Sequence, residues 1–202
     1  MSRIAVLVSG GGSNLAALID AQARSRLGGG KIVRVISSRA GVRALERAQA
    51  AGIPTGLALR EGSTQEEFDA AILWELEVAK PDIVVMAGFL SVVGQGVIQK
   101  YAGRIVNVHP SLLPAFGGPG MYGLRVHMAA LAHGVKVTGA TVHLVSEQVD
   151  AGEILAQKAV DVLPGDTPQT LQRRVMEQAE WVLLPQVVGE MAAKNREVCH
   201  SG

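Results

Sequence analysis

Two polar side chains near the end of a buried apolar run are the first residues that could do chemistry. Asn107 and His109 lie two residues apart, so on an extended chain both point to the same face. Histidine titrates near neutral pH and can act as a general acid or a charged hydrogen-bond donor. An asparagine amide can stabilise an oxyanion without changing its protonation state. The pair suits a reaction that develops negative charge on oxygen; the alternative is two side chains satisfied by loop backbone.

A carboxylate further along the chain is a candidate partner for this histidine. Asp150 lies in segment 146–152, which joins two strand-like runs and ends in Ala151 and Gly152. Beside an imidazole, a carboxylate orients the ring and raises its pKa. The alternative is a simple turn residue. Metal binding is not expected, because the sequence has no cysteine pair and no HExxH motif. The other internal histidines, His127, His133 and His143, show no ligand-like spacing.

A glycine-rich turn after the first apolar run is the other segment with chemical meaning. Gly10, Gly11 and Gly12 are followed by Ser13 and Asn14, between a strand-like and a helix-like stretch. Free amides at such a helix N-terminus can hold a phosphate. The alternative is a plain tight turn in which Ser13 or Asn14 caps the helix.

More elaborate nucleotide motifs do not fit this turn. The dinucleotide fingerprint G-x-G-x-x-G would need glycine at Leu15, and the second strand ends in Arg39 without an acid for the ribose. A Walker phosphate loop would need Gly-Lys-Ser/Thr, and no Gly-x-Ser-x-Gly nucleophile elbow occurs. The turn therefore predicts a site for a single phosphate.

Alternating strands and helices must position these residues. The run 4–8 is continuously apolar, which is typical of a strand buried on both faces. Further strands are expected at 32–36, 83–86 and 105–108, with a short run at 55–59. Helical periodicity covers 15–23, 42–51, 68–78 and 94–101. The alternation predicts parallel βαβ units in an open, doubly wound α/β sheet, whose ligands bind beyond the carboxyl ends of the strands.

The second half of the sequence changes character. Runs 137–145 and 154–162 lie close together, which predicts an antiparallel pair appended to the parallel sheet. A helical stretch follows from Thr167 to about residue 194, with Asp166 or Thr167 as N-cap and Pro168 in the first turn. We expect Pro185 to kink or divide this helix.

Composition limits the classes of function. The 202 residues contain 48% hydrophobic and 18% charged residues and carry a formal net charge of +1. This balance excludes wholesale disorder and gives no reason to expect a nucleic acid or an anionic membrane as partner. The longest apolar run, 83–93, is too short to span a membrane, and the lone Cys199 fits a reducing compartment. We expect a cytoplasmic protein.

Four motifs in this order resemble the phosphoribosylglycinamide formyltransferase family of folate-dependent formyltransferases. They are Ser9-Gly10-Gly11-Gly12-Ser13-Asn14-Leu15, Ala87-Gly88-Phe89, Asn107-Val108-His109-Pro110-Ser111-Leu112-Leu113-Pro114 and Asp150-Ala151-Gly152. The resemblance covers residues 4 to about 188. It implies one Rossmann-like domain over 1–202, with a phosphate-binding half to about 108. The other half, from about 109, would carry the catalytic loop, the added strands and the C-terminal helix.

The resemblance also implies an activity. Family members transfer a formyl group from 10-formyltetrahydrofolate to the amine of glycinamide ribonucleotide in purine biosynthesis, directly and without a metal. The two small molecules would be the partners of a monomer or homodimer. A formyltetrahydrofolate hydrolase, a methionyl-tRNA formyltransferase and a non-catalytic nucleotide-binding module are the alternatives. The first two usually carry an additional N-terminal or C-terminal domain.

Site residues follow from the resemblance. Asn107, His109 and Asp150 match the family's catalytic trio, in which Asn107 and a protonated His109 hold the oxyanion. The positions that match the ribonucleotide site are Gly12, Ser13, Asn14 and, more distantly, Glu180. The positions that match folate-enclosing segments are Phe89, Leu90, Ser91, Val92, Val93, Ser146, Glu147, Gln148 and Val149. Thr141 and His143 match polar positions on the strand that leads to Asp150.

The sequence departs from the family pattern at a few of these places. Ser91 stands where relatives carry arginine, and Gln65 replaces a frequent basic residue, with Arg60 nearby. Glu180 follows one extra residue, and segment 116–122 is longer than in many relatives.

Overall fold

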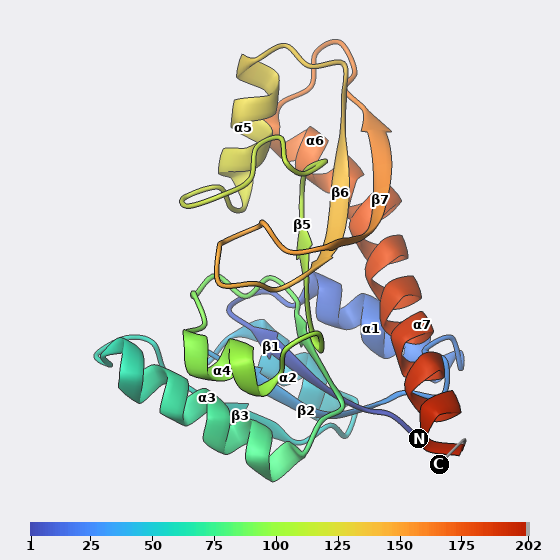
Figure 1. Ribbon diagram of the computed structural model, residues 1–202. Helices are drawn as coiled ribbons and strands as arrows, with labels where there is room; N and C mark the ends of the chain where they lie inside the picture. Colours follow the sequence, from blue (N-terminus) through green and yellow to red (C-terminus); the bar gives the residue numbers. More distant parts are fainter. Residues whose placement is uncertain (201–202) are drawn as a thin grey trace.

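One seven-stranded sheet forms the centre of the molecule (Figure 1). The computed structural model describes residues 1–200 and the side chains of residues 1–196, so the side chain of Cys199 lies outside the described residues. The strand order is β3-β2-β1-β4-β5-β6-β7. The strands are β1 Arg3–Val8, β2 Lys31–Ser37, β3 Thr55–Leu57, β4 Ile83–Met86, β5 Ile105–His109, β6 Val137–Leu144 and β7 Ile154–Asp161. The first five are parallel, and β6 and β7 add to β5 as an antiparallel pair, which confirms the predicted sheet.

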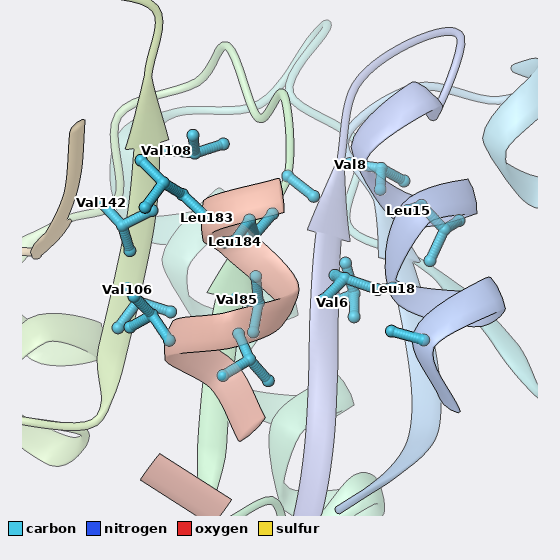
Figure 2. Close-up of a cluster of buried hydrophobic side chains, with 14 of the residues drawn as sticks. Val6, Val8, Leu15, Leu18, Val85, Val106, Val108, Val142, Leu183 and Leu184 are labelled. Atoms are coloured by element: carbon cyan, nitrogen blue, oxygen red, sulfur yellow. The ribbon is translucent and has the colours of Figure 1, made fainter. Parts of the chain in front are cut away.

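Helices cover both faces of the sheet. They are α1 Ser13–Ala23, α2 Arg43–Ala50, α3 Gln65–Ala79, α4 Gln95–Lys100, α5 Leu124–Ala132, α6 Pro168–Val175 and α7 Trp181–His200. Alternate residues of β1 divide between two apolar clusters. Val6 and Val8 pack with Leu15 of α1 and Leu184 of α7, as Figure 2 shows, whereas Leu7 packs with Phe68 of α3. This division explains why the buried strands read as continuous apolar runs.

The C-terminal helical stretch is divided at a different place from the one predicted. A π-helical turn, Met176–Glu180, separates α6 from α7, and Pro185 lies inside α7. A π turn holds one more residue than the α-helical turn that it replaces, so the division lies where the extra residue is accommodated. Because Pro185 is only the fifth residue of α7, its missing N–H leaves just the Trp181 carbonyl without a helical donor. Thr167 caps α6, since its hydroxyl accepts from the Thr170 amide.

The structure also contains a helix that the sequence did not reveal. Helix α5 is short, and its buried Val126 and Ala130 lie one turn apart behind a glycine-rich segment. Among the described helices, none is long and apolar enough to cross a membrane.

Candidate active site

A cavity of about 550 Å³ opens beyond the carboxyl ends of β1, β4 and β5, where an open α/β sheet is expected to bind ligands. The predicted site residues that line it are Ser13, Asn14, Phe89, Leu90, Ser91, Val92, Val93, Asn107, His109, Ser146, Glu147, Gln148, Val149, Asp150 and Glu180. Two residues matched to the family site, Gly12 and Thr141, do not line it. The cavity thus brings together segments that are up to 167 positions apart, from Ser13 to Glu180.

Strand β5 presents Asn107 and His109 to this cavity. His109 is buried, and its Nδ1 lies 3.3 Å from Oδ2 of Asp150. Its Nε2 lies 2.9 Å from the carbonyl oxygen of Phe116. Both ring nitrogens therefore face acceptor oxygens, an arrangement that only the imidazolium satisfies in full.

The antiparallel neighbour adds His143 to the cluster. In the β5–β6 register His143 pairs with Asn107, and Thr141 pairs with His109. His143 Nδ1 lies 2.8 Å from the Leu144 carbonyl oxygen and donates to it, and His143 Nε2 lies 3.2 Å from Asn107 Nδ2. Thr141 instead supports the loop after β5, because its hydroxyl accepts from the Leu113 amide and donates to the Ser111 carbonyl.

Asp150 joins the two histidines. Its Oδ1 lies 3.6 Å from His143 Nε2, and its Oδ2 accepts from the Gly118 amide at 2.9 Å. Burial alone would raise the pKa of Asp150. The contact with His143, the Gly118 hydrogen bond and the nearby His109 charge outweigh burial and lower the pKa. The residue is therefore a carboxylate at neutral pH.

The structure corrects the expected protonation state of His109. Asp150 does act to raise the pKa of His109, and the Phe116 carbonyl acts in the same direction. Burial of the ring is the larger influence, and the net pKa of His109 is lowered from its usual value. Before substrate binds, the neutral imidazole is favoured, contrary to the protonated form expected from the sequence.

At the opposite end of the cavity the glycine turn opens α1. Gly12 is the N-cap residue with φ 70°, and neither Ser13 nor Asn14 makes a side-chain cap, so the simple capping alternative is wrong. A Cβ on Gly12 would lie 2.8 Å from the Cβ of Ala44. The first intrahelical acceptor is the Gly12 carbonyl, bound by the Ala16 amide, so the amides of the first turn have no hydrogen-bond partner among the described residues.

Asn14 is held by a residue from the far end of the chain. Its Nδ2 donates to Oε2 of Glu180 at 2.7 Å, and its Oδ1 is buried without a partner among the described residues. Glu180 ends the π turn and is buried, and burial raises the pKa of its carboxyl. The hydrogen bond from Asn14 opposes this shift without reversing it.

The stretch from Phe89 to Val93 forms an apolar wall of the cavity mouth. Phe89 stacks on Phe68 with ring centroids 6.2 Å apart. The Leu90 amide donates to the Ser9 hydroxyl, and Gln65 Nε2 donates to the Val92 carbonyl at 3.2 Å. Gln65 therefore fixes the backbone of this wall, and Ser91 lines the cavity without adding charge.

Some lining residues were not identified from the sequence. They are Met86, Ile98, the segment 118–123, Gln172 and Met176. The glycines and proline of 117–120 are typical of an irregular loop and could have pointed to this segment, but nothing in the sequence indicates that Met176 lines the cavity. Within the described part of the chain, no cluster of three metal-ligating side chains occurs.

Comparison with known proteins supports one family. The family model for formyl transferases matches residues 2–188. The chain is 43% identical to the human trifunctional purine biosynthetic protein adenosine-3 over 202 residues, which is 100% of this chain and 19% of that protein. It is 37% identical to phosphoribosylglycinamide formyltransferase of Escherichia coli K12 over 190 residues, covering 94% of this chain and 86% of that one.

A solved structure agrees with these relatives. Glycinamide ribonucleotide transformylase 1 from Symbiobacterium toebii superposes with a TM-score of 0.89 and 40% identity, covering 96% of this chain and 89% of that chain. The chain spans 13–19% of the trifunctional relatives and 86% of the Escherichia coli one. On the match of its sequence and its fold, the chain belongs to the formyl transferase family.

Proposed function

We propose that this chain transfers a formyl group from 10-formyltetrahydrofolate to the amine of glycinamide ribonucleotide, in purine biosynthesis. One observation carries the proposal: the Asn107–His109–Asp150 cluster and the Ser13–Asn14 turn line the same cavity. A phosphate on the turn and a formyl group beside His109 would place the two reactants in one enclosed space. The names of the bacterial relatives supply the ribonucleotide acceptor and the formyl group, and the folate donor is taken from the resemblance of the sequence motifs.

The cluster can stabilise the charge that this reaction develops. As the amine attacks the formyl carbon, its oxygen gains negative charge, which the free N–H of Asn107 and His109 Nε2 can hold. His109 must exchange the Phe116 carbonyl for that oxygen. Because burial disfavours the imidazolium in the free protein, a developing oxyanion beside it favours protonation most in the transition state.

Asp150 has two tasks in this scheme. Its Oδ2 lies 3.3 Å from His109 Nδ1, so its negative charge attracts and orients the protonated ring. As a carboxylate, it can also take the proton that the amine loses, directly or through a water. The new carbon–nitrogen bond forms, the bond from the formyl carbon to N10 of the folate breaks, and N10 recovers a proton. No covalent intermediate on the protein is needed.

The test is a comparison of two incubations with 10-formyltetrahydrofolate, one with and one without glycinamide ribonucleotide. Release of tetrahydrofolate only in the presence of the ribonucleotide supports transfer. Equal release in both would assign a hydrolase instead. Absence of release in both, with phosphate still bound, would favour a non-catalytic binding module.

The partners in this proposal are two small molecules. A net charge of +1 supports neither a nucleic acid nor a membrane as partner. A cytoplasmic location is proposed with the activity. The mass in solution distinguishes the two proposed forms, a monomer and a homodimer.

A further inference from the structure

A second cavity adjoins the glycine turn from the other side. It has a volume of about 700 Å³ and lies between α1 and α7, with Ala16 and Ala17 of α1 facing Pro185 of α7. Ser13 lines both cavities. The start of α1 therefore separates the two cavities. A ligand bound at the glycine turn can contact residues of either cavity.

Unpaired hydrogen-bond donors collect in this second cavity. Arg47 donates from Nε to the Gly11 carbonyl at 3.0 Å, and its two terminal nitrogens have no partner in the described part of the chain. Trp181 lines the same cavity, and its Nε1 is buried without a partner among the residues described. The carboxylate there, Asp20, is already engaged by Arg24 and Arg26. A cavity lined by unpaired hydrogen-bond donors suits a ligand with several hydrogen-bond acceptors, such as an oxyanion.

The first cavity cannot balance the charge of such an oxyanion by itself. Among the described residues that line it there is no lysine or arginine, while Glu147, Asp150 and Glu180 are carboxyl groups. A phosphate monoester carries nearly two negative charges at neutral pH, and the amides of one helix N-terminus offer only about half a charge.

The fold places Arg47 where it can supply the missing charge. Helix α2 packs against the glycine turn, since the Ala44 amide donates to the Gly10 carbonyl at 3.1 Å. The Arg47 side chain follows the same surface, with its Cδ 3.5 Å from where a Gly12 Cβ would lie. The bond to Gly11 then holds the guanidinium beside the turn, in the second cavity.

We propose that Arg47 is a further substrate-binding residue, which contacts the phosphate of the ribonucleotide from the second cavity with the Trp181 N–H beside it. This assignment rests on the proposed function, whose phosphate site it completes. The phosphate then lies beside Ser13, where groups from both cavities can reach it. The first turn of α1 supplies backbone amides, and α2 supplies the fixed positive charge.

The test measures the ribonucleotide KM and kcat of the wild type, Arg47→Gln, Arg47→Lys and Trp181→Phe. Loss of a charge-assisted hydrogen bond should raise the KM of Arg47→Gln by about 10- to 100-fold while kcat changes by less than about threefold. Arg47→Lys should recover part of the affinity, and Trp181→Phe, which removes the N–H but keeps an aromatic side chain, should raise KM less. The control is Arg43→Gln, an exposed arginine of the same helix that lines neither cavity.

A second measurement separates binding from folding and from the proposed function. Calorimetric titration with inorganic phosphate should show weaker binding to Arg47→Gln than to the wild type, and thermal unfolding should show that both are folded. A ribonucleotide KM and a phosphate affinity of Arg47→Gln within about twofold of the wild type would overturn the role of Arg47. A wild type that binds phosphate through Arg47 but releases no tetrahydrofolate would instead overturn the proposed function.

Discussion

The two ends of the first cavity are formed by different kinds of chemical group. At the histidine end, defined here as Asn107, His109, His143 and Asp150, four side chains from neighbouring strands and a loop contact one another. At the turn end, defined as Gly12, Ser13, Asn14 and Glu180, backbone amides have no partner among the described residues and one side-chain pair supports them. Side chains that titrate suit a charge that appears during a reaction. Fixed backbone dipoles suit a charge that the substrate carries permanently.

At both ends of the cavity, burial favours the neutral form of a titratable group. It lowers the pKa of His109 and raises that of Glu180, so in each case the neutral form gains. Asp150 is different, because hydrogen bonds and a neighbouring histidine offset its burial and keep it ionised. In the free protein, Asp150 is thus the carboxylate around which the histidine end is arranged.

The largest effect is expected from substitutions that disrupt the histidine end. In Asp150→Asn and His109→Ala, loss of the oriented oxyanion donor should reduce kcat by about 10²- to 10³-fold, with a much smaller change in the KM for ribonucleotide. Steady-state rates of tetrahydrofolate release measure both constants. Glu153→Gln, an exposed carboxylate just beyond the same loop, is the matched control and should keep the wild-type rate. Near-normal turnover in both site variants would remove these residues from the chemistry.

A second effect of similar size concerns the buried His127 on α5, whose pKa is lowered by burial and, to a smaller extent, by the charge of His109. His127 is fully buried, both of its ring nitrogens lack partners among the described residues, and burial lowers its pKa to about 4. The unfolded chain takes up its proton near pH 6.5, whereas the folded protein resists protonation. This part of the stability is present above pH 6.5 and lost as the pH falls to about 4, a change of about 3 kcal/mol.

Urea unfolding between pH 7 and 4 tests this assignment. In His127→Leu the free energy of unfolding should fall less on acidification than in the wild type, while exposed His133→Gln should behave as the wild type does. A His127→Leu variant with an unchanged pH dependence would show that the acid sensitivity arises elsewhere.

The two ends also differ in how far the sequence could predict them. The strands and the glycine turn are local patterns, and Asn107 and His109 share one strand, so their common face followed from spacing alone. The contact between Asn14 and Glu180 joins residues 166 positions apart and depends on a π turn that no apolar period reveals. The direction of the His109 pKa was predicted wrongly, because the sequence identifies Asp150 as a neighbour but does not show how deeply the ring is buried.

A third prediction addresses the turn end. Gly12→Ala places a Cβ 2.9 Å from the Ala44 backbone at a φ of 70°, which should cost about 1–3 kcal/mol of stability and raise the ribonucleotide KM. Gly11→Ala is the matched control, because its Cβ would meet nothing within 4 Å. Thermal unfolding and steady-state kinetics of the pair measure the difference. Equal behaviour of the two variants would mean that the turn adapts and that its backbone geometry is not what binds phosphate.

The smallest effect is expected for Glu180→Gln, and it decides whether the turn end needs a charge at all. The raised pKa of Glu180 means that its stabilising contribution is present below pH 4.5 and is lost as the pH rises through the folded value. Glutamine cannot ionise, yet its carbonyl still accepts from Asn14. The variant should therefore be more stable than the wild type near neutral pH, with a ribonucleotide KM changed by less than about threefold.

Glu177→Gln, a substitution of an exposed residue in the same π turn, is the control and should show no such gain in stability. If Glu180→Gln instead lost ribonucleotide affinity, the carboxylate itself would contact the substrate. The turn end would then rely on side-chain charge as the histidine end does.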